Sequence, residues 1–68
     1  MVISETQKNK YIADVHAEMS KRGLSEGDIK KVISKTGFED VMRLYPEEQM
    51  HYAITDAVNE ILLVAAVS

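Results

Sequence analysis

Apolar side chains recur at intervals of three and four residues in the first third of the chain, which is the spacing of one face of an α-helix. The members of this stripe are Tyr11, Ile12, Val15 and Met19. Upstream, Ser4 and Gln7 have the spacing of a capping box, in which each side chain binds the other residue's backbone N–H. We therefore predict a helix that begins after Ser4 and ends at Gly23.

A second amphipathic segment follows directly. Ser25 is placed to cap it, and Glu26 and Asp28 lie in its first turn, where the helix dipole favours negative charge. The residues expected to face the core are Ile29, Val32 and Ile33. We predict that this helix ends at Gly37, because glycine adopts the left-handed conformation of a helix end at little cost.

One phrase occurs twice between residues 20 and 40. SKRGLSE at 20–26 returns fourteen residues later as SKTGFED at 34–40. We interpret both copies as helix ends, in which glycine reverses the backbone and the apolar residue after it packs on the last turn. Leu24 is then expected to contact Met19, and Phe38 to contact Ile33.

The rest of the chain predicts a short helix over 39–45 and a long one over 47–66, with Pro46 in the first turn of the latter. The core stripe of the long helix is Met50, Ala53, Ile54, Ala57, Val58, Ile61, Leu62 and Ala65. Leu63, Val64 and Val67 leave this stripe, so the end of the helix is apolar on nearly all sides. Such an end needs a cover, which is a second copy of the chain, another protein, or the N-terminal residues 1–3.

These elements predict an all-α fold: a single helical domain over residues 1–68, built as a small bundle of three to four helices with a long C-terminal helix. A chain of 68 residues has a marginal core, which a disulfide, a metal or a second subunit often strengthens. The sequence has no cysteine, so a disulfide is excluded. A homodimer through the C-terminal helix is therefore one of the open interpretations.

Charge is unevenly distributed. Residues 1–38 hold seven Lys/Arg against five Asp/Glu, and residues 39–68 hold one against six, so +2 and −5 make the net charge of −3. No segment is basic enough to be typical of nucleic-acid binding. The longest apolar run, at 61–67, is well short of the ~20 residues that span a bilayer. With no recognisable secretory signal and no cysteine, we expect a cytoplasmic protein without a membrane span.

One short motif has metal-binding spacing. Glu48 and His51 form the E-x-x-H unit that di-iron bundles use twice, and Glu18 or Glu60 would be further ligands in a symmetric dimer. The alternative, which we prefer, is a surface histidine beside helix-start carboxylates. The chain has no G-x-S-x-G turn and no glycine-rich phosphate loop. We expect no enzymatic activity, no catalytic residue, no metal and no cofactor.

Residues 19–32 resemble the helix-turn-helix of bacterial repressors. Gly23 stands at the turn, and Ile29 and Val32 fall where the second helix of that motif packs on the first. The resemblance implies a small DNA-binding regulator. Its phosphate contacts would come from Lys30, Lys31 and Lys35. The acidic first turn of the second helix would oppose the phosphates, so DNA binding is the alternative function and not the first.

Residues 23–58, from GLSEGDIKK to ITDAV, are also similar to small helical orphan proteins of Gram-positive phages and integrated elements. This resemblance implies a cytosolic protein that binds a host protein. We accordingly predict a non-enzymatic protein-interaction module whose partner is another protein or a second copy of the chain. Its surface combines exposed apolar residues with an acidic row that sets partner choice. The predicted interface residues are Tyr52, Asp56, Asn59, Glu60, Leu63, Val64 and Val67.

Overall fold

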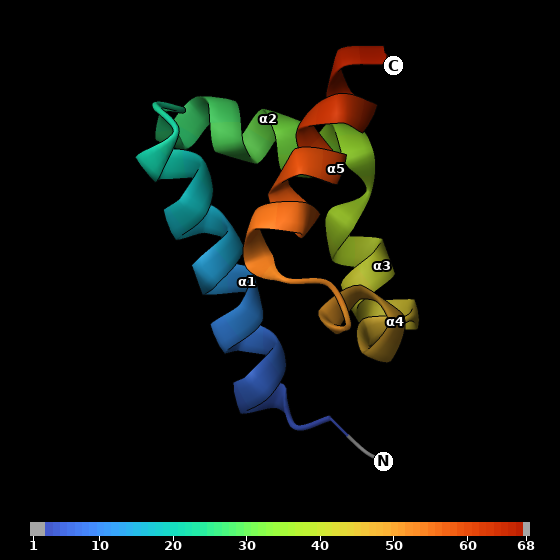
Figure 1. The fold of residues 1–68 in the computed structure, drawn as a ribbon. Helices are drawn as coiled ribbons and strands as arrows, with labels where there is room; N and C mark the ends of the chain where they lie inside the picture. Colours follow the sequence, from blue (N-terminus) through green and yellow to red (C-terminus); the bar gives the residue numbers. More distant parts are fainter. Residues whose placement is uncertain (1–2, 68) are drawn as a thin grey trace.

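The computed structural model describes residues 3–67, which form five helices and no strand (Figure 1). The helices are α1 (Glu5–Lys21), α2 (Glu26–Thr36), α3 (Phe38–Leu44), α4 (Pro46–Met50) and α5 (Ile54–Val67). In Figure 1, α1 runs along one side, α2 crosses its upper end, and α5 passes between α1 and α3. The predicted all-α fold with a long C-terminal helix is confirmed.

The starts of the first two helices follow from their capping residues. The Ser4 hydroxyl accepts a hydrogen bond from the Gln7 N–H at 3.1 Å, and the Gln7 side chain accepts one from the Ser4 N–H at 3.1 Å. Ser25 caps α2 in the same way, because its hydroxyl accepts from the Asp28 N–H at 3.2 Å. Both predicted helix starts are confirmed. In each, the capping serine binds a backbone N–H only three residues later in the chain.

Both copies of the repeated phrase are helix ends, as predicted. Gly23 and Gly37 have positive φ angles of 98° and 68°. After α1, the Gly23 N–H donates to the Ser20 carbonyl at 3.0 Å and the Leu24 N–H to the Met19 carbonyl at 3.2 Å. This pair of bonds is the Schellman arrangement, which satisfies carbonyls that have no partner inside the helix. After α2, the chain turns at Gly37 directly into α3.

Gly37 and Gly27 provide a matched pair of variants that tests whether Gly37 is a left-handed helix end. We predict that Gly37→Ala lowers the free energy of unfolding by about 1 kcal/mol, because alanine resists a left-handed backbone. Nothing lies within 4 Å of the added Cβ, so strain alone sets the effect. Gly27→Ala, in the exposed first turn of α2, is expected to raise that free energy by up to about 1 kcal/mol. Urea denaturation of both variants checks the two signs, and equal signs would contradict the assignment.

The prediction of one continuous helix over 47–66 is wrong, because residues 51–53 are not helical and separate α4 from α5. The Tyr11 hydroxyl, in the middle of α1, lies 3.0 Å from both the Gln49 and the Tyr52 carbonyl oxygens, which share its one proton, and the Gln49 carbonyl also accepts from the Tyr52 N–H at 3.2 Å. In a continuous helix these carbonyls would accept from backbone N–H groups four residues later. The Tyr11 hydroxyl replaces the missing donor at the Tyr52 carbonyl and adds to the bond at the Gln49 carbonyl, and it thereby stabilises the interruption.

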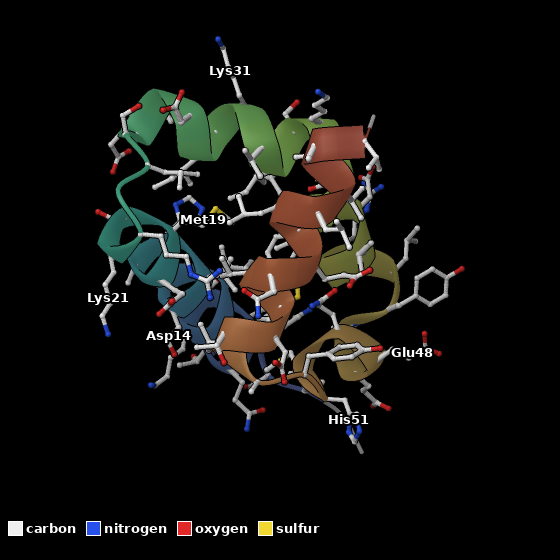
Figure 2. All side chains as sticks on the ribbon, turned by 45° about the horizontal axis from the view of Figure 1, so that its top comes forward. Asp14, Met19, Lys21, Lys31, Glu48 and His51 are labelled. Atoms are coloured by element: carbon white, nitrogen blue, oxygen red, sulfur yellow. The ribbon has the colours of Figure 1, made fainter. Side chains whose placement is uncertain are left out.

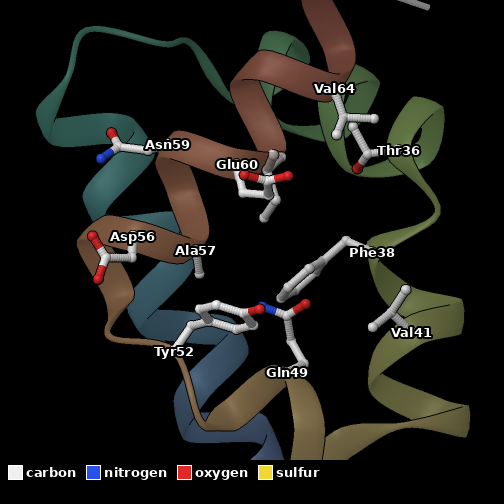
Figure 3. Close-up of a pocket in the computed structure, with 11 residues that line it drawn as sticks. Thr36, Phe38, Val41, Gln49, Tyr52, Asp56, Ala57, Asn59, Glu60 and Val64 are labelled. Carbon is white, nitrogen blue, oxygen red and sulfur yellow. The ribbon is translucent and has the colours of Figure 1, made fainter.

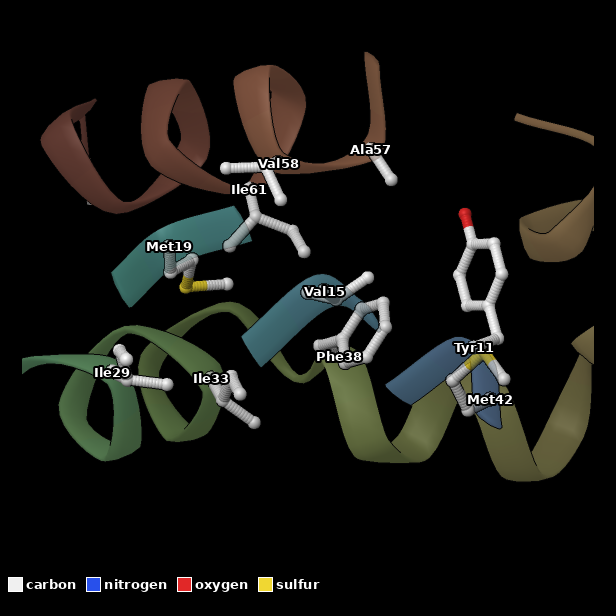
Figure 4. Close-up of a cluster of buried hydrophobic side chains, with 10 residues drawn as sticks. All are labelled: Tyr11, Val15, Met19, Ile29, Ile33, Phe38, Met42, Ala57, Val58 and Ile61. Atoms are coloured by element: carbon white, nitrogen blue, oxygen red, sulfur yellow. The ribbon is translucent and has the colours of Figure 1, made fainter. Parts of the chain in front are cut away.

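A single core connects the helices (Figure 4). The buried side chains are Tyr11, Val15, Met19, Ile29, Ile33, Phe38, Met42, Ala57, Val58 and Ile61. Several other predicted core residues pack against this cluster while partly buried, namely Ile12, Leu24, Val32, Met50, Ile54 and Leu62. Ala53 was expected in the core stripe of the last helix, but it is exposed in the interruption. Phe38 is part of the buried cluster and Leu24 packs against it, so both apolar residues after the glycines fold back as the helix-end interpretation requires.

Candidate functional site

The α3–α5 groove is a hollow of about 530 Å³ between α3, α5 and the segment that joins α4 to α5. It is lined by Thr36, Phe38, Val41, Gln49, Tyr52, Asp56, Ala57, Asn59, Glu60, Ile61 and Val64. In Figure 3, α3 forms one wall with Phe38 and Val41, and Val64 of α5 lies at the end opposite Tyr52. The lining is mainly apolar, so the groove exposes hydrophobic surface that folding alone does not bury.

Local structure determines what the groove contains. The turn at Gly37 places the Phe38 ring in the core, where it is 2% exposed, and the same ring lines the groove. The interruption at 51–53 brings Tyr52 to one end of the groove, with its side chain 57% exposed. The groove therefore depends on two changes of chain direction, one at a glycine and one at a tertiary hydrogen bond.

Alongside the groove, α5 presents an outer face made of Asp56, Glu60, Leu63 and Val67. These residues are separated by four, three and four positions, so they form one row along the helix. Leu63 is 60% exposed and Val67 is 78% exposed. The first half of the outer face is thus acidic and the second half is apolar. The opposite side of α5 holds the buried Ala57, Val58 and Ile61.

Glu60 differs from every other acidic residue of the chain. Each of the others lies in the first turn of a helix or in an ion pair. Asp56, for example, lies in the first turn of α5, where the helix dipole stabilises it. The Glu60 side chain has no hydrogen bond or ion pair with residues 3–67, and in Figure 3 it extends over the apolar groove. No lysine or arginine lines the groove, so its charge is uniformly negative.

Asn59 has a structural partner. Its Oδ1 accepts a 2.6 Å hydrogen bond from Nη1 of Arg22, and the same guanidinium donates to the Thr55 carbonyl at 3.3 Å. Arg22 also pairs with Glu18 of α1 at 2.8 Å. Arg22 thereby joins the end of α1 to α5, and this fixes α5 on the side away from α3. The oxygen of Asn59 is therefore already hydrogen-bonded within the chain.

The structure brings most of the predicted interface residues together. Those that line the groove are Tyr52, Asp56, Asn59, Glu60 and Val64, and Leu63 and Val67 lie on the adjoining outer face. The sequence prediction missed the other wall, which consists of Thr36, Phe38, Val41 and Gln49. No local pattern marks these four residues as a surface, because they face α5 only through tertiary packing.

The described N-terminal residues do not cover the end of α5. The start of α1 and the end of α5 lie at opposite ends of the molecule in Figure 1. Ile3 is half-buried at its own end, whereas Leu63 and Val67 are exposed. The expectation that residues 1–3 cover the apolar end falls in part on Met1 and Val2, which are outside the described residues. Among residues 3–67, nothing buries the outer face.

The lysines of the alternative function are all exposed on α2. Lys31 points away from the body of the protein in Figure 2. Lys30 lines a shallow hollow together with Glu39 and Asp40, so carboxylates adjoin the surface that would meet phosphates. The DNA-binding alternative through Lys30, Lys31 and Lys35 stays a prediction.

The E-x-x-H motif is at the surface. Glu48 is exposed in the middle of the short helix α4 and His51 is exposed directly after its end, and both point outward in Figure 2. Within residues 3–67, no group of three or more His, Cys, Asp or Glu side chains is arranged to hold a metal ion.

No helix in the described part of the chain is long and apolar enough to cross a membrane. The chain matches no protein-family model, and comparisons with curated proteins and with solved structures give no match.

Proposed function

We propose that the protein is a non-enzymatic protein-interaction module that binds through the α3–α5 groove and the outer face of α5. The observation that carries this proposal is the continuity of the two surfaces. Val64 lines the groove, and Leu63 beside it begins the exposed apolar half of the outer face. An apolar groove that continues into an exposed apolar helix end is typical of a site for another macromolecule.

The composition of the groove supports binding in preference to catalysis. Its titratable side chains are two carboxylates and one tyrosine, and it contains no histidine, lysine or serine. Its one aliphatic hydroxyl, on Thr36, is hydrogen-bonded to the Val32 carbonyl at 2.9 Å and has no base beside it. A hydroxyl acts as a nucleophile only when a base lies within hydrogen-bonding distance of it, and Thr36 has no such base in the groove. Binding requires only the apolar surface and the charge that the groove already has.

The sequence is compatible with two kinds of partner, a second copy of the chain and another protein. The charge of the outer face favours another protein. A cytoplasmic location is part of the same proposal. It is supported by the absence of cysteine, which fits a protein that a reducing compartment does not affect.

The double variant Leu63→Glu, Val67→Glu tests whether the apolar end is an interface. Both side chains are largely exposed, so we predict that the free energy of unfolding changes by less than about 0.5 kcal/mol per site. The same variant should lose a protein that the wild-type chain captures from lysate of its source cells. Thermal unfolding followed by circular dichroism and capture from matched lysates measure the two effects.

The double variant Ala13→Glu, Ala17→Glu is the matched control, because it adds two carboxylates with the same spacing of four at exposed positions of α1, a helix that contributes no residue to the groove. It should leave capture intact. Unfolding of the double variant would show that Leu63 and Val67 belong to the core, and would contradict the proposal. Capture that disappears after nuclease treatment would favour Lys30, Lys31 and Lys35 as a nucleic-acid surface instead.

A further inference from the structure

We infer that the partner surface is an amphipathic α-helix of another protein, with apolar residues toward one end and Lys or Arg toward the other. This inference rests on the proposed function and specifies the chemistry of the partner. The apolar part would lie on Val64, Leu63 and Val67 and against the α3 wall. The basic part would pair with Glu60 and Asp56.

The charge of the partner follows from Glu60. Its carboxylate extends over an apolar groove and has no cation within residues 3–67, whereas the other acidic residues have a helix start or an ion pair. A ligand that covers the groove removes water from this carboxylate, which costs free energy unless the ligand brings a positive charge. Asp56, one turn earlier on the same face, favours the same sign. A basic side chain satisfies both residues, and an acidic one opposes both.

The apolar half of the outer face determines the rest of the partner. Leu63, Val64 and Val67 lie within five residues of one another at the end of α5, and residues 61–67 contain no charged side chain. Phe38 and Val41 provide apolar surface on the facing wall. A complementary ligand therefore has apolar side chains at this end and its charges at the other. From Asp56 to Val67 the helix rises about 16 Å, which corresponds to about three turns of a partner helix.

The secondary structure of the site favours a helical ligand. An extended peptide binds well when a sheet edge offers unpaired N–H and C=O groups, and residues 3–67 contain no strand. The walls of the groove are helices, whose backbone groups are already paired along most of their length. A bound helix satisfies its own backbone and contributes side chains alone, which is the mode that an apolar groove accommodates.

A second copy of the chain fits this surface poorly. In an antiparallel symmetric dimer, the Glu60 carboxylate of each copy would lie opposite apolar residues of the other, where it would be buried without a cation. In a parallel dimer, Asp56 and Glu60 would lie opposite their own counterparts. Neither α5 nor the groove lining contains a Lys, Arg or His, and the one Lys or Arg of residues 39–68, Arg43, is paired with Asp40 at 3.0 Å. Neither arrangement supplies a cation to Glu60, so charge complementarity favours a different protein.

Two synthetic helical peptides of about 16 residues, long enough to cover three turns, test this inference on the full-length protein. Both carry leucines at intervals of three and four at one end. One peptide has lysines at the other end, and its counterpart has glutamates at the same positions. We expect the lysine peptide to bind, with NMR shifts at the methyl groups of Leu63, Val64 and Val67, and the glutamate peptide not to bind.

Charge variants of the protein separate site-specific pairing from general attraction to an acidic protein. Glu60→Lys should weaken binding of the lysine peptide by about tenfold, since it replaces an attraction with a repulsion. Asp14→Lys makes the same change in net charge on the solvated side of α1, where the lost ion pair with Lys10 is exposed, and it should leave binding nearly unchanged. Glu60→Gln, which only removes the charge, should give an intermediate effect.

Each alternative outcome contradicts the inference in a distinct way. Equal effects of Glu60→Lys and Asp14→Lys would mean that the attraction is not specific to the groove. Equal binding of the two peptides, or binding of neither, would show that the partner is not a basic helix. A dimer that becomes tighter in Glu60→Lys would identify a second copy as the occupant. In all of these cases, loss of captured protein in the Leu63 and Val67 variant would still support the proposed function.

Discussion

Replacing Phe38 with alanine should remove a large part or all of the protein's free energy of unfolding at 25 °C. The ring is 2% exposed and lies in the cluster that contains residues from α1, α2, α3 and α5. Truncation of a buried phenylalanine typically costs about 3–5 kcal/mol, because it removes buried apolar surface and leaves a cavity. A domain of this length has a total stability on the order of 3–10 kcal/mol. We therefore expect a fall in melting temperature of at least about 12 °C, or no cooperative transition, by circular dichroism.

Tyr45→Ala is the control for this experiment. Tyr45 follows α3 directly and is 57% exposed, so truncating it removes an aromatic ring that the core does not use. It should lower the free energy of unfolding by no more than about 0.5 kcal/mol. If the two variants melted alike, the Phe38 ring would not be in the core. The groove, whose wall includes Phe38, would then be incorrectly described as well.

The parts of the fold that the sequence predicted correctly are those that neighbouring residues determine. Ser4 and Ser25 cap the helices that follow them, and Gly23 and Gly37 have the positive φ angles that their places in the repeated phrase require. Each of these features needs only groups within about one turn of the chain. Their physical cause is therefore visible in a short stretch of sequence.

The interruption between α4 and α5 has no such local cause. Residues 51–53 are His, Tyr and Ala, with neither glycine nor proline, and they continue an apolar helical pattern. The side-chain donor to the two carbonyls at the interruption is the hydroxyl of Tyr11, which lies 38 and 41 positions earlier in the chain. The sequence assigned Tyr11 to the core stripe of α1, which is correct for its ring, but periodicity says nothing about the partner of its hydroxyl.

The same distinction applies to the candidate site. Helical periodicity identified Leu63 and Val67 as residues on the outward side of α5, and both are exposed. The facing wall could not be predicted, because Val41 and Gln49 become groove residues only through the position of α3 and α4 relative to α5. Helical periodicity shows which face of a helix points away from the core. It does not show which other helix packs next to that face.

Tyr11→Phe isolates the hydroxyl that stabilises the interruption. The ring is retained, so the core loses no apolar volume, but the Tyr52 carbonyl loses its 3.0 Å donor and the Gln49 carbonyl keeps only the Tyr52 N–H at 3.2 Å. The Gln49 side-chain amide, which donates to the same hydroxyl at 3.4 Å, loses its acceptor. Leaving partly buried polar groups unpaired costs about 1–3 kcal/mol. We predict a loss of stability of that size by urea denaturation, together with faster amide hydrogen exchange at the start of α5.

Tyr52→Phe is a control with the same chemical change. Tyr52 is 57% exposed, and its hydroxyl has no partner within residues 3–67, so its removal should change stability by less than about 0.5 kcal/mol. Equal stability of the two variants would mean that the interruption does not depend on Tyr11. If Tyr11→Phe is destabilised as predicted, it should also bind the lysine peptide more weakly. Gln49 and Tyr52 form one end of the groove, and their position depends on the same hydroxyl that holds α4 against α1.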